Sequence, residues 1–377
     1  MDFELDDAQQ EIQALAARIV GDRLAPEQLR QLERAGTWFA RDVWEELGRT
    51  GLLGLALPEA HGGGGLGLLE ACLVAEELGR AAAPLPYLPV VVGAGLALAR
   101  FGSSEQQARH LPGLAAGASI VTVALHEPVE VAVPVVPTTQ AIADGGGWRL
   151  HGEKVVVSAL GEAEAVLVPA RTGDHASTLF LVEPTASGAT VVEEVAMTGE
   201  PLATLLLDGV EVGPDAVVGT VGGGHEATSF IESRLVAGAC AMQTGVCAGA
   251  LALTASYVST REQFGVRLGT FQAVGQRVAD AYIDTEAVRL TARQAAWRLD
   301  AGLEADDALM TAKFWAADGG HRVVHAAQHL HGGIGVDLDY PVHRYFRIAK
   351  VLELLLGGAT PSLRRLGSLL VSAPAGS

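Results

Sequence analysis

Two changes in sequence pattern, near residues 119 and 227, constrain the fold of this chain more than any other feature. Before the first change, apolar residues such as Ile12, Leu15 and Ile19 recur at the spacing of a helix face. Between the two changes, short β-branched runs alternate with Gly, Pro and Asp, as in strands joined by turns. After the second change the helical spacing returns. This order predicts an α+β protein with an N-terminal helical domain (1–118), a central β domain (119–226) and a C-terminal helical domain (227–377).

The expected elements follow from the same patterns. Helices are predicted over 6–34, 40–53, 68–79, 90–101, 227–259, 271–301, 305–330 and 361–370, and strands over 120–125, 148–157, 165–168, 178–182 and 203–212. Strands and helices do not alternate along the chain, and no Gly-x-Gly-x-x-Gly follows a predicted strand. The order therefore excludes a doubly wound dinucleotide-binding fold.

Composition excludes several classes of partner. Hydrophobic residues make up 49% of the 377 residues, enough for buried cores, and 26 basic against 44 acidic residues give a net charge of −18. A broad surface for nucleic acid or an anionic membrane is therefore disfavoured. The stretch 81–99 carries no charge, but Pro84, Pro86 and Pro89 interrupt it. We expect a buried turn and a helix there rather than a membrane span.

Cysteine and histidine usage indicates the compartment and argues against a metal site. The three cysteines are Cys72, Cys240 and Cys247. They have neither metal-ligand spacing nor the pattern of a secreted disulfide framework, so a reducing cytoplasm is predicted. Four histidines lie close together in the sequence: His321, His325, His329 and His331. No acidic cluster at ligand spacing accompanies them, so no metal site is predicted.

Four stretches, in this order along the chain, resemble acyl-CoA dehydrogenases. They read MDFELDDAQQEIQ at 1–13, GLLGLALPEAHGGGGLGLLEACLVAEELGR at 51–80, REQFGVRLGTFQAV at 261–274 and QHLHGGIGVDLDYPVHRYFRIAK at 328–350. The resemblance covers nearly the whole chain. It implies the family's fold, in which the C-terminal domain is a four-helix domain, and it implies FAD as cofactor and an acyl-CoA thioester as substrate.

The resemblance also implies residues that complete the FAD site of a neighbouring subunit. These are Arg261, Phe264, Gln272, His329, Gly332 and Gly333. We expect Arg261 and Phe264 on one helix face, where a guanidinium can meet phosphate and a ring can meet apolar parts of the flavin. Gly332 and Gly333 would let the backbone approach the dinucleotide closely. The family commonly has Gln where this chain has His329.

The elements that contact the flavin ring depart from the family pattern. The family carries a loop reading EPGAGSD, whereas here Glu127-Pro128 is followed by VEVAV at 129–133. A later strand usually reads GQKxWIT, whereas residues 152–158 read GEKVVVS. Ser158 preserves a hydroxyl that can bond near the flavin, and Val156 stands where the family has Trp.

The catalytic carboxylate that removes the α proton in this family is missing from its usual positions. The matching residues here are Gly358 (or Leu356 in a register shifted by two), Ser233 and Met242. None of them can accept a proton. Glu232 and Glu353 are the displaced candidates, and the interpretation that both are ordinary helix acids is favoured over a catalytic one.

Three functions remain open at this stage. The favoured one is the supporting subunit of a heteromeric FAD-dependent acyl-CoA dehydrogenase, which completes the FAD site of a second, similar chain. The first alternative is a self-sufficient homomeric dehydrogenase with Glu232 or Glu353 as base. The second is a family member that binds acyl thioesters without redox chemistry. Acyl-CoA, a second dehydrogenase-like chain or a second copy, and an electron-transfer flavoprotein are the implied partners.

Overall fold

A computed structural model of the chain describes residues 4–128 and 132–372. Its contacts divide the chain into two compact units, and each is described by itself. The first unit comprises residues 1–37, 68–83 and 236–377, and the second comprises residues 38–67 and 84–235. The residues of VEVAV that lie at 129–131 are outside the described part. The three sequence domains stay a prediction.

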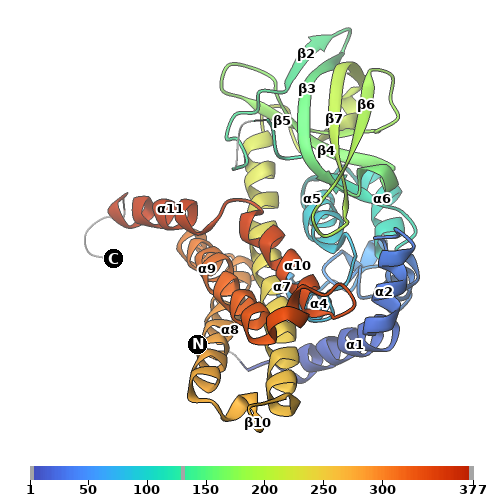
Figure 1. The fold of residues 1–377 in the computed structure, drawn as a ribbon. Coiled ribbons are helices and arrows are strands. Elements are labelled where there is room, and N and C mark those ends of the chain that lie inside the picture. Colours follow the sequence, from blue (N-terminus) through green and yellow to red (C-terminus); the bar gives the residue numbers. More distant parts are fainter. Residues whose placement is uncertain (1–3, 129–131, 373–377) are drawn as a thin grey trace. The chain divides into compact units, whose positions relative to one another are not determined.

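The second unit holds an eight-stranded sheet, green in Figure 1. Its strands are β1 (Val121–Val123), β2 (Gln140–Asp144), β3 (Gly147–Ser158), β4 (Ala165–Arg171), β5 (Ser177–Val182), β6 (Ala189–Val195), β7 (Pro201–Val212) and β8 (Val217–Val218). The order across the sheet is β6-β7-β3-β2-β4-β5-β8, and β1 pairs with β4. Most neighbours are antiparallel, but β4 pairs parallel with both β1 and β2.

The sheet forms because its β-branched and aliphatic runs build one core. Strand β4 is buried at six successive positions, as expected for a strand covered on both faces. Leu150, Val166, Phe180 and Leu205, from four different strands, meet in that core. Burial of such side chains contributes roughly 1.5–3 kcal/mol each.

The second unit also contains helices. They are α3 (Arg41–Arg49), the single-turn η1 (Glu59–His61), the π-helical η2 (Leu88–Gly95), α5 (Leu96–Phe101), α6 (Ser104–Ala116), the 3₁₀ turns η3 (Leu160–Glu162) and η4 (Pro214–Ala216), and the first part of α7 (Gly224–Thr260). Helix α6 begins with a capping box, in which Ser103 and Gln106 satisfy each other's backbone N–H groups. The expected turn and helix in 81–99 is seen as η2 running into α5, and both are largely buried.

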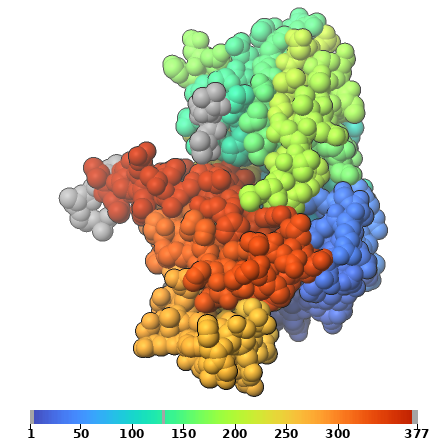
Figure 2. Space-filling view, viewed as in Figure 1, coloured from blue at the N-terminus to red at the C-terminus, as the bar shows by residue number. Residues whose placement is uncertain are grey.

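The first unit is helical. Its helical elements are α1 (Asp7–Arg23), α2 (Pro26–Arg34), α4 (Leu68–Arg80), the second part of α7 (Gly224–Thr260), the 3₁₀ turn η5 (Leu268–Thr270), α8 (Gln272–Asp300), α9 (Asp306–His331), the 3₁₀ turn η6 (Gly332–Val336), α10 (Val342–Leu354) and α11 (Ala359–Ser372). Figure 2 shows the orange and red surface of the C-terminal helices. A two-stranded hairpin, β9 (Glu262–Gln263) with β10 (Val266–Arg267), joins α7 to α8 (Figure 1).

The predicted fold class is confirmed, and several element predictions were wrong or incomplete. The single helix predicted over 6–34 is two helices, because Pro26 disfavours helical backbone at Ala25 and then starts α2 at its first position. Strands β2, β6 and β8 were not predicted; β2 and β6 are mostly exposed and β8 has two residues, so each gives a weak apolar signal. Helices α6 and α10 were also missed.

Helix α7 is apolar and long enough to pass a length-and-composition test for a membrane span, the one described helix that does so. Of its most apolar window, 83% is buried within the protein. A mostly buried apolar helix is expected at the core of a globular domain, so the test is weak evidence for a membrane.

Candidate functional site

Residues 262–267 form the β9–β10 hairpin, the 3₁₀ turn η5 (Leu268–Thr270) follows, and α8 begins at Gln272. This corrects the expected placement of Arg261 and Phe264 on one helix face. Helix α7 ends at Thr260, and Phe264 has a left-handed φ of +56° at the turn between β9 and β10. Gly265, also at positive φ, allows the chain to reverse there. A helix would need negative φ at Phe264. The positive φ therefore excludes the helix that was expected to carry Arg261 and Phe264 on one face.

The hairpin presents its functional groups outward. Phe264 is 91% exposed, and its ring meets that of Phe271 edge-to-face at 6.2 Å. Arg261 and Gln272 are also exposed. No described side chain forms an ion pair with the Arg261 guanidinium. A large exposed aromatic ring on strained backbone, next to an unpaired cation, is typical of a surface that binds something.

A second group of predicted residues lies at the end of α9. His329 is in the last turn of α9, and its Nδ1 contacts Nη1 of Arg277 on α8. Gly332 has φ +61°, and no atom lies within 4 Å of the point where a Cβ would stand on Gly332 or Gly333. The open space at both glycines fits the expected close approach of a ligand to the backbone.

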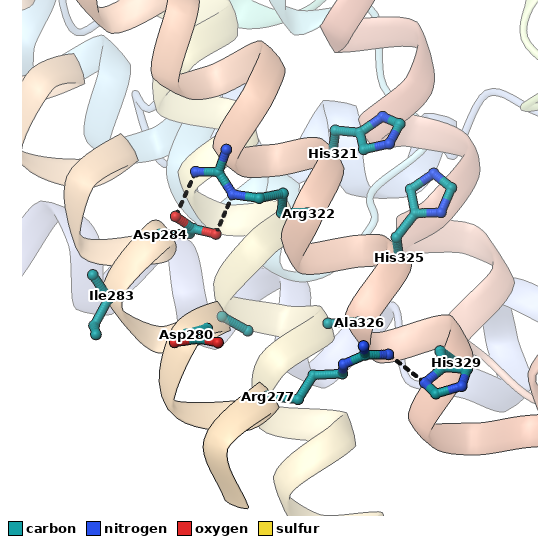
Figure 3. A pocket seen from close by; sticks show the side chains of 10 residues that line it. Arg277, Asp280, Ile283, Asp284, His321, Arg322, His325, Ala326 and His329 are labelled. Atoms are coloured by element: carbon teal, nitrogen blue, oxygen red, sulfur yellow. Dashed lines mark hydrogen bonds and ion pairs between the residues drawn. The ribbon is translucent and has the colours of Figure 1, made fainter. Parts of the chain in front are cut away.

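Arg277 and His329 line a cavity of about 720 Å³ between α8 and α9, shown in Figure 3. The remaining lining residues are Asp280, Ala281, Ile283, Asp284, His321, Arg322, His325 and Ala326. The rings of His321 and His325 stack with centroids 4.0 Å apart. Burial and the neighbouring His321 and Lys350 lower the pKa of His325. Among the described residues no set of three or more ligating side chains is grouped as for a metal ion.

Ser158, in the second unit, donates its hydroxyl to the carboxylate of Glu200. Burial raises the pKa of Glu200, and the bond from Ser158 opposes that rise. The hydroxyl predicted to face a flavin is thus engaged within the chain. Val156 nearby on β3 has φ +57°, and the residue is about half exposed. It offers no aromatic surface to shield a ring system.

Glu127, the first residue of the altered loop, is part of a buried polar network. It forms an ion pair with Lys154 at 2.7 Å, and neither side chain has exposed surface. Thr138 and Thr139 each donate a backbone N–H and a hydroxyl to the same carboxylate. Burial raises the pKa of Glu127, but Lys154 and the threonines outweigh it and lower the pKa to about 2. Glu127 is a structural anion.

The positions expected to hold a base carry none. Ser233 donates its hydroxyl to the carbonyl of Phe230 in α7, and Met242 lies further along the same helix. Gly358 lies in the turn between α10 and α11, and the shifted alternative, Leu356, is buried at φ +57°. Neither register supplies a carboxylate.

The two displaced acids differ in setting. Glu353, on α10, accepts a hydrogen bond from Lys350 at 2.6 Å, and its Oε2 lies 3.1 Å from Nδ1 of His321. Burial raises the pKa of Glu353, but Lys350 and His321 outweigh it, so the pKa is lowered. A carboxylate held in this way is a weaker base than an ordinary one. Glu232 lies on α7 and has interactions within the chain.

Sequence reasoning missed Arg277, Glu200 and Lys154. Arg277 lies in the first two turns of α8, after Gln272, in an ordinary polar pattern, and Glu200 lies 42 residues from its partner Ser158. Lys154 could have been suspected, because a lysine in an apolar strand needs a buried partner.

The order of helical, β and helical segments is that of the acyl-CoA dehydrogenase class of fold. The eight-stranded sheet and the exposed hairpin before α8 agree with this class. Family models bear this out: the acyl-CoA dehydrogenase N-terminal domain matches residues 6–118, and the acyl-CoA dehydrogenase C-terminal domain matches residues 228–366. Acyl-CoA dehydrogenase FadE27 of Mycobacterium tuberculosis is 42% identical over 384 residues, covering 100% of both chains. The chain belongs to the acyl-CoA dehydrogenase family, whose members are oxidoreductases that act on acyl-CoA and use FAD.

Solved structures agree. The ChsE4–ChsE5 complex from Mycobacterium tuberculosis contains a chain that is 42% identical with a TM-score of 0.93, covering 100% of each chain. A variant of the Tcur3481–Tcur3483 steroid ACAD contains one that is also 42% identical, with a TM-score of 0.89, covering 97% of this chain and 98% of that one.

The residues of this chain fit FAD on one side and not on the other. Exposed Arg261, Phe264 and Gln272, with the open backbone at Gly332 and Gly333, suit a dinucleotide presented from outside. On the ring side, the hydroxyl of Ser158 is occupied by Glu200, and the aromatic shield is absent from Val156.

Proposed function

We propose that this chain is the supporting subunit of a heteromeric acyl-CoA dehydrogenase. Its hairpin and the end of α9 would complete an FAD site whose ring-binding part belongs to a second, homologous chain. FAD, when bound, supplies the hydride acceptor for α,β-dehydrogenation of the acyl thioester. This chain would contribute binding and orientation of the dinucleotide, and its partner would contribute the base.

One contrast carries the proposal. Phe264 and Arg261 are displayed to solvent on a strained turn, whereas Ser158 is consumed by an internal bond to Glu200. A chain that held its own flavin ring would need the hydroxyl of Ser158 to be available to the flavin. The lack of a carboxylate at Gly358, Ser233 and Met242 points the same way.

The relatives support the heteromer and suggest a substrate class. One solved neighbour is a complex of two named chains, and another is titled a steroid ACAD. We infer that the substrate of the assembled enzyme is an acyl-CoA thioester with a steroid acyl group. An electron-transfer flavoprotein as electron acceptor and a cytoplasmic location complete the proposal.

Flavin content tests the assembly. The chain is purified alone and co-expressed with a homologous dehydrogenase chain of the same organism, and FAD is measured by absorbance against total protein. We expect little flavin in the chain alone. In a stable complex we expect bound FAD, in fewer copies than there are protein chains. A yellow chain that oxidises an acyl-CoA alone would contradict the proposal and favour the homomeric alternative.

The location of the base tests the division of labour. Glu232→Gln and Glu353→Gln in this chain should leave turnover of the complex within a few fold, because neither carboxylate is expected to meet the substrate. The matched change of the catalytic glutamate in the partner should lower turnover by orders of magnitude, since proton abstraction has no other acceptor. Loss of flavin reduction in either variant of this chain would assign the base here.

A further inference from the structure

Arg277 is the cation of the α8–α9 cavity whose charge is not balanced by a carboxylate. It is exposed, it lines the cavity, and no described carboxylate forms an ion pair with it. The other arginine of the cavity, Arg322, donates to both oxygens of Asp284 at 2.6 and 2.8 Å. The charge available to a ligand is therefore that of Arg277.

His329 holds Arg277 toward the cavity (Figure 3). A guanidinium has only donors, so Nδ1 of His329 must accept, and the neutral ring carries its proton on Nε2. The bond joins residues 52 apart in the sequence and leaves the remaining guanidinium N–H groups without a partner among the described residues, so they can donate to an oxyanion. His329 acts here by positioning Arg277 and by offering Nε2–H as a second donor.

The rest of the cavity suits a nucleotide better than a simple anion. Asp280, three residues after Arg277 and also exposed, is a carboxylate that would repel free phosphate but can accept from ribose hydroxyls. The stacked imidazoles of His321 and His325 provide flat surfaces beside it. A volume of about 720 Å³ is large enough for such a ligand.

The cavity lies beside the residues already proposed for the dinucleotide. Helix α8 begins at Gln272 and α9 ends at His331, so the Arg277–His329 bond ties the start of one helix to the end of the other. Gly332 and Gly333 follow directly. One end of the α8–α9 pair therefore holds the open backbone at Gly332 and Gly333, the Nε2–H donor of His329 and the guanidinium of Arg277.

We propose that Arg277 binds the diphosphate of a ligand that carries adenosine diphosphate, with His329 as its positioning residue. Two ligands of the enzyme carry that group: FAD and coenzyme A. This inference rests on the proposed function, because it assigns a further binding residue on the surface that this chain gives to its partner.

The test uses the assembled complex. FAD dissociation constants and KM for the acyl-CoA are measured for Arg277→Gln, with Arg18→Gln as a charge-matched control on the exposed face of α1. Loss of one charge-assisted hydrogen bond should weaken binding roughly ten- to hundredfold. Binding should also become less sensitive to salt, while the control stays unchanged.

The two sources give different results. A raised FAD dissociation constant with unchanged KM assigns the diphosphate to FAD, and a raised KM with unchanged FAD binding assigns it to coenzyme A. His329→Leu should reproduce part of the loss, and His329→Gln should restore it, because an amide oxygen can also accept from Arg277. If Arg277→Gln disturbs assembly, Arg277→Lys keeps the charge without the planar fork and should give an intermediate loss.

Arg261→Ala separates failure of this inference from failure of the proposed function. If Arg261→Ala weakens FAD binding and Arg277→Gln changes neither constant, the inference is overturned and the proposed function stands. If neither variant changes either constant, both are overturned.

Discussion

Glu127 and Lys154 match residues of two family motifs, and in this chain they form a buried ion pair that stabilises the fold. Both side chains are fully buried, and each oxygen of the carboxylate has partners. Lys154→Met should destabilise the chain by about 3–5 kcal/mol, because it leaves the carboxylate buried without its cation. Urea unfolding measures this. A double variant Glu127→Gln/Lys154→Met that is as unstable as the single one would contradict the assignment of the loss to an unpaired charge.

The same ion pair predicts that the free energy of unfolding falls at acid pH. The folded pKa of Glu127, about 2, lies below its ordinary value of 4.5, so the unfolded chain binds more protons between these values. Its contribution to the free energy of unfolding is fully present above pH 4.5 and is lost as the pH falls toward 2. It amounts to about 3 kcal/mol. Unfolding of parent and Glu127→Gln chains should converge in this window; a constant difference would contradict the coupling.

At the scale of an element, the hairpin between α7 and α8 exposes an aromatic side chain on a strained backbone, which lowers the stability of the folded chain. Phe264 occupies left-handed backbone with 91% of its surface exposed. Phe264→Gly should stabilise the isolated chain slightly, by up to about 1 kcal/mol, since glycine adopts positive φ without strain. Phe264→Ala should leave stability nearly unchanged. Both variants should lower FAD retention of the complex, measured by flavin release on dilution; full retention would remove the hairpin from the site.

Helix α10 ends on a buried lysine of α9. Nζ of Lys313 donates to the carbonyls of Leu352 and Glu353, and burial lowers the pKa of Lys313 to about 8. Because the unfolded pKa is near 10.5, the unfolded chain binds more protons between pH 8 and 10.5, and stability rises with pH there. The free energy of unfolding of the parent, relative to Lys313→Met, should therefore increase across that window. A flat difference would show that Lys313 titrates normally.

At the scale of the whole molecule, a net charge of −18 keeps the chain dispersed, yet its C-terminal helices expose large apolar side chains, including Leu354, Leu363 and Leu370. We expect an obligate oligomer, because burying such surface stabilises by roughly 25 cal/mol per Å². Light scattering of the purified chain at micromolar concentration should give a mass above that of one chain, and a stable monomer would contradict this.

The sequence by itself determined the order of helical, β and helical segments, the class of fold and the family. Helical and strand periodicities report which face of each element is buried, and motifs such as the segment 261–274 report local chemistry. It also determined that the usual base positions carry no acid.

Only the tertiary structure decided what those residues do. It turned the segment holding Arg261 and Phe264 into a hairpin, joined Ser158 to Glu200, and joined Arg277 to His329. These partners lie 42 and 52 residues apart. No local pattern encodes such pairings, because the packing of whole elements brings partners together that are far apart in the sequence.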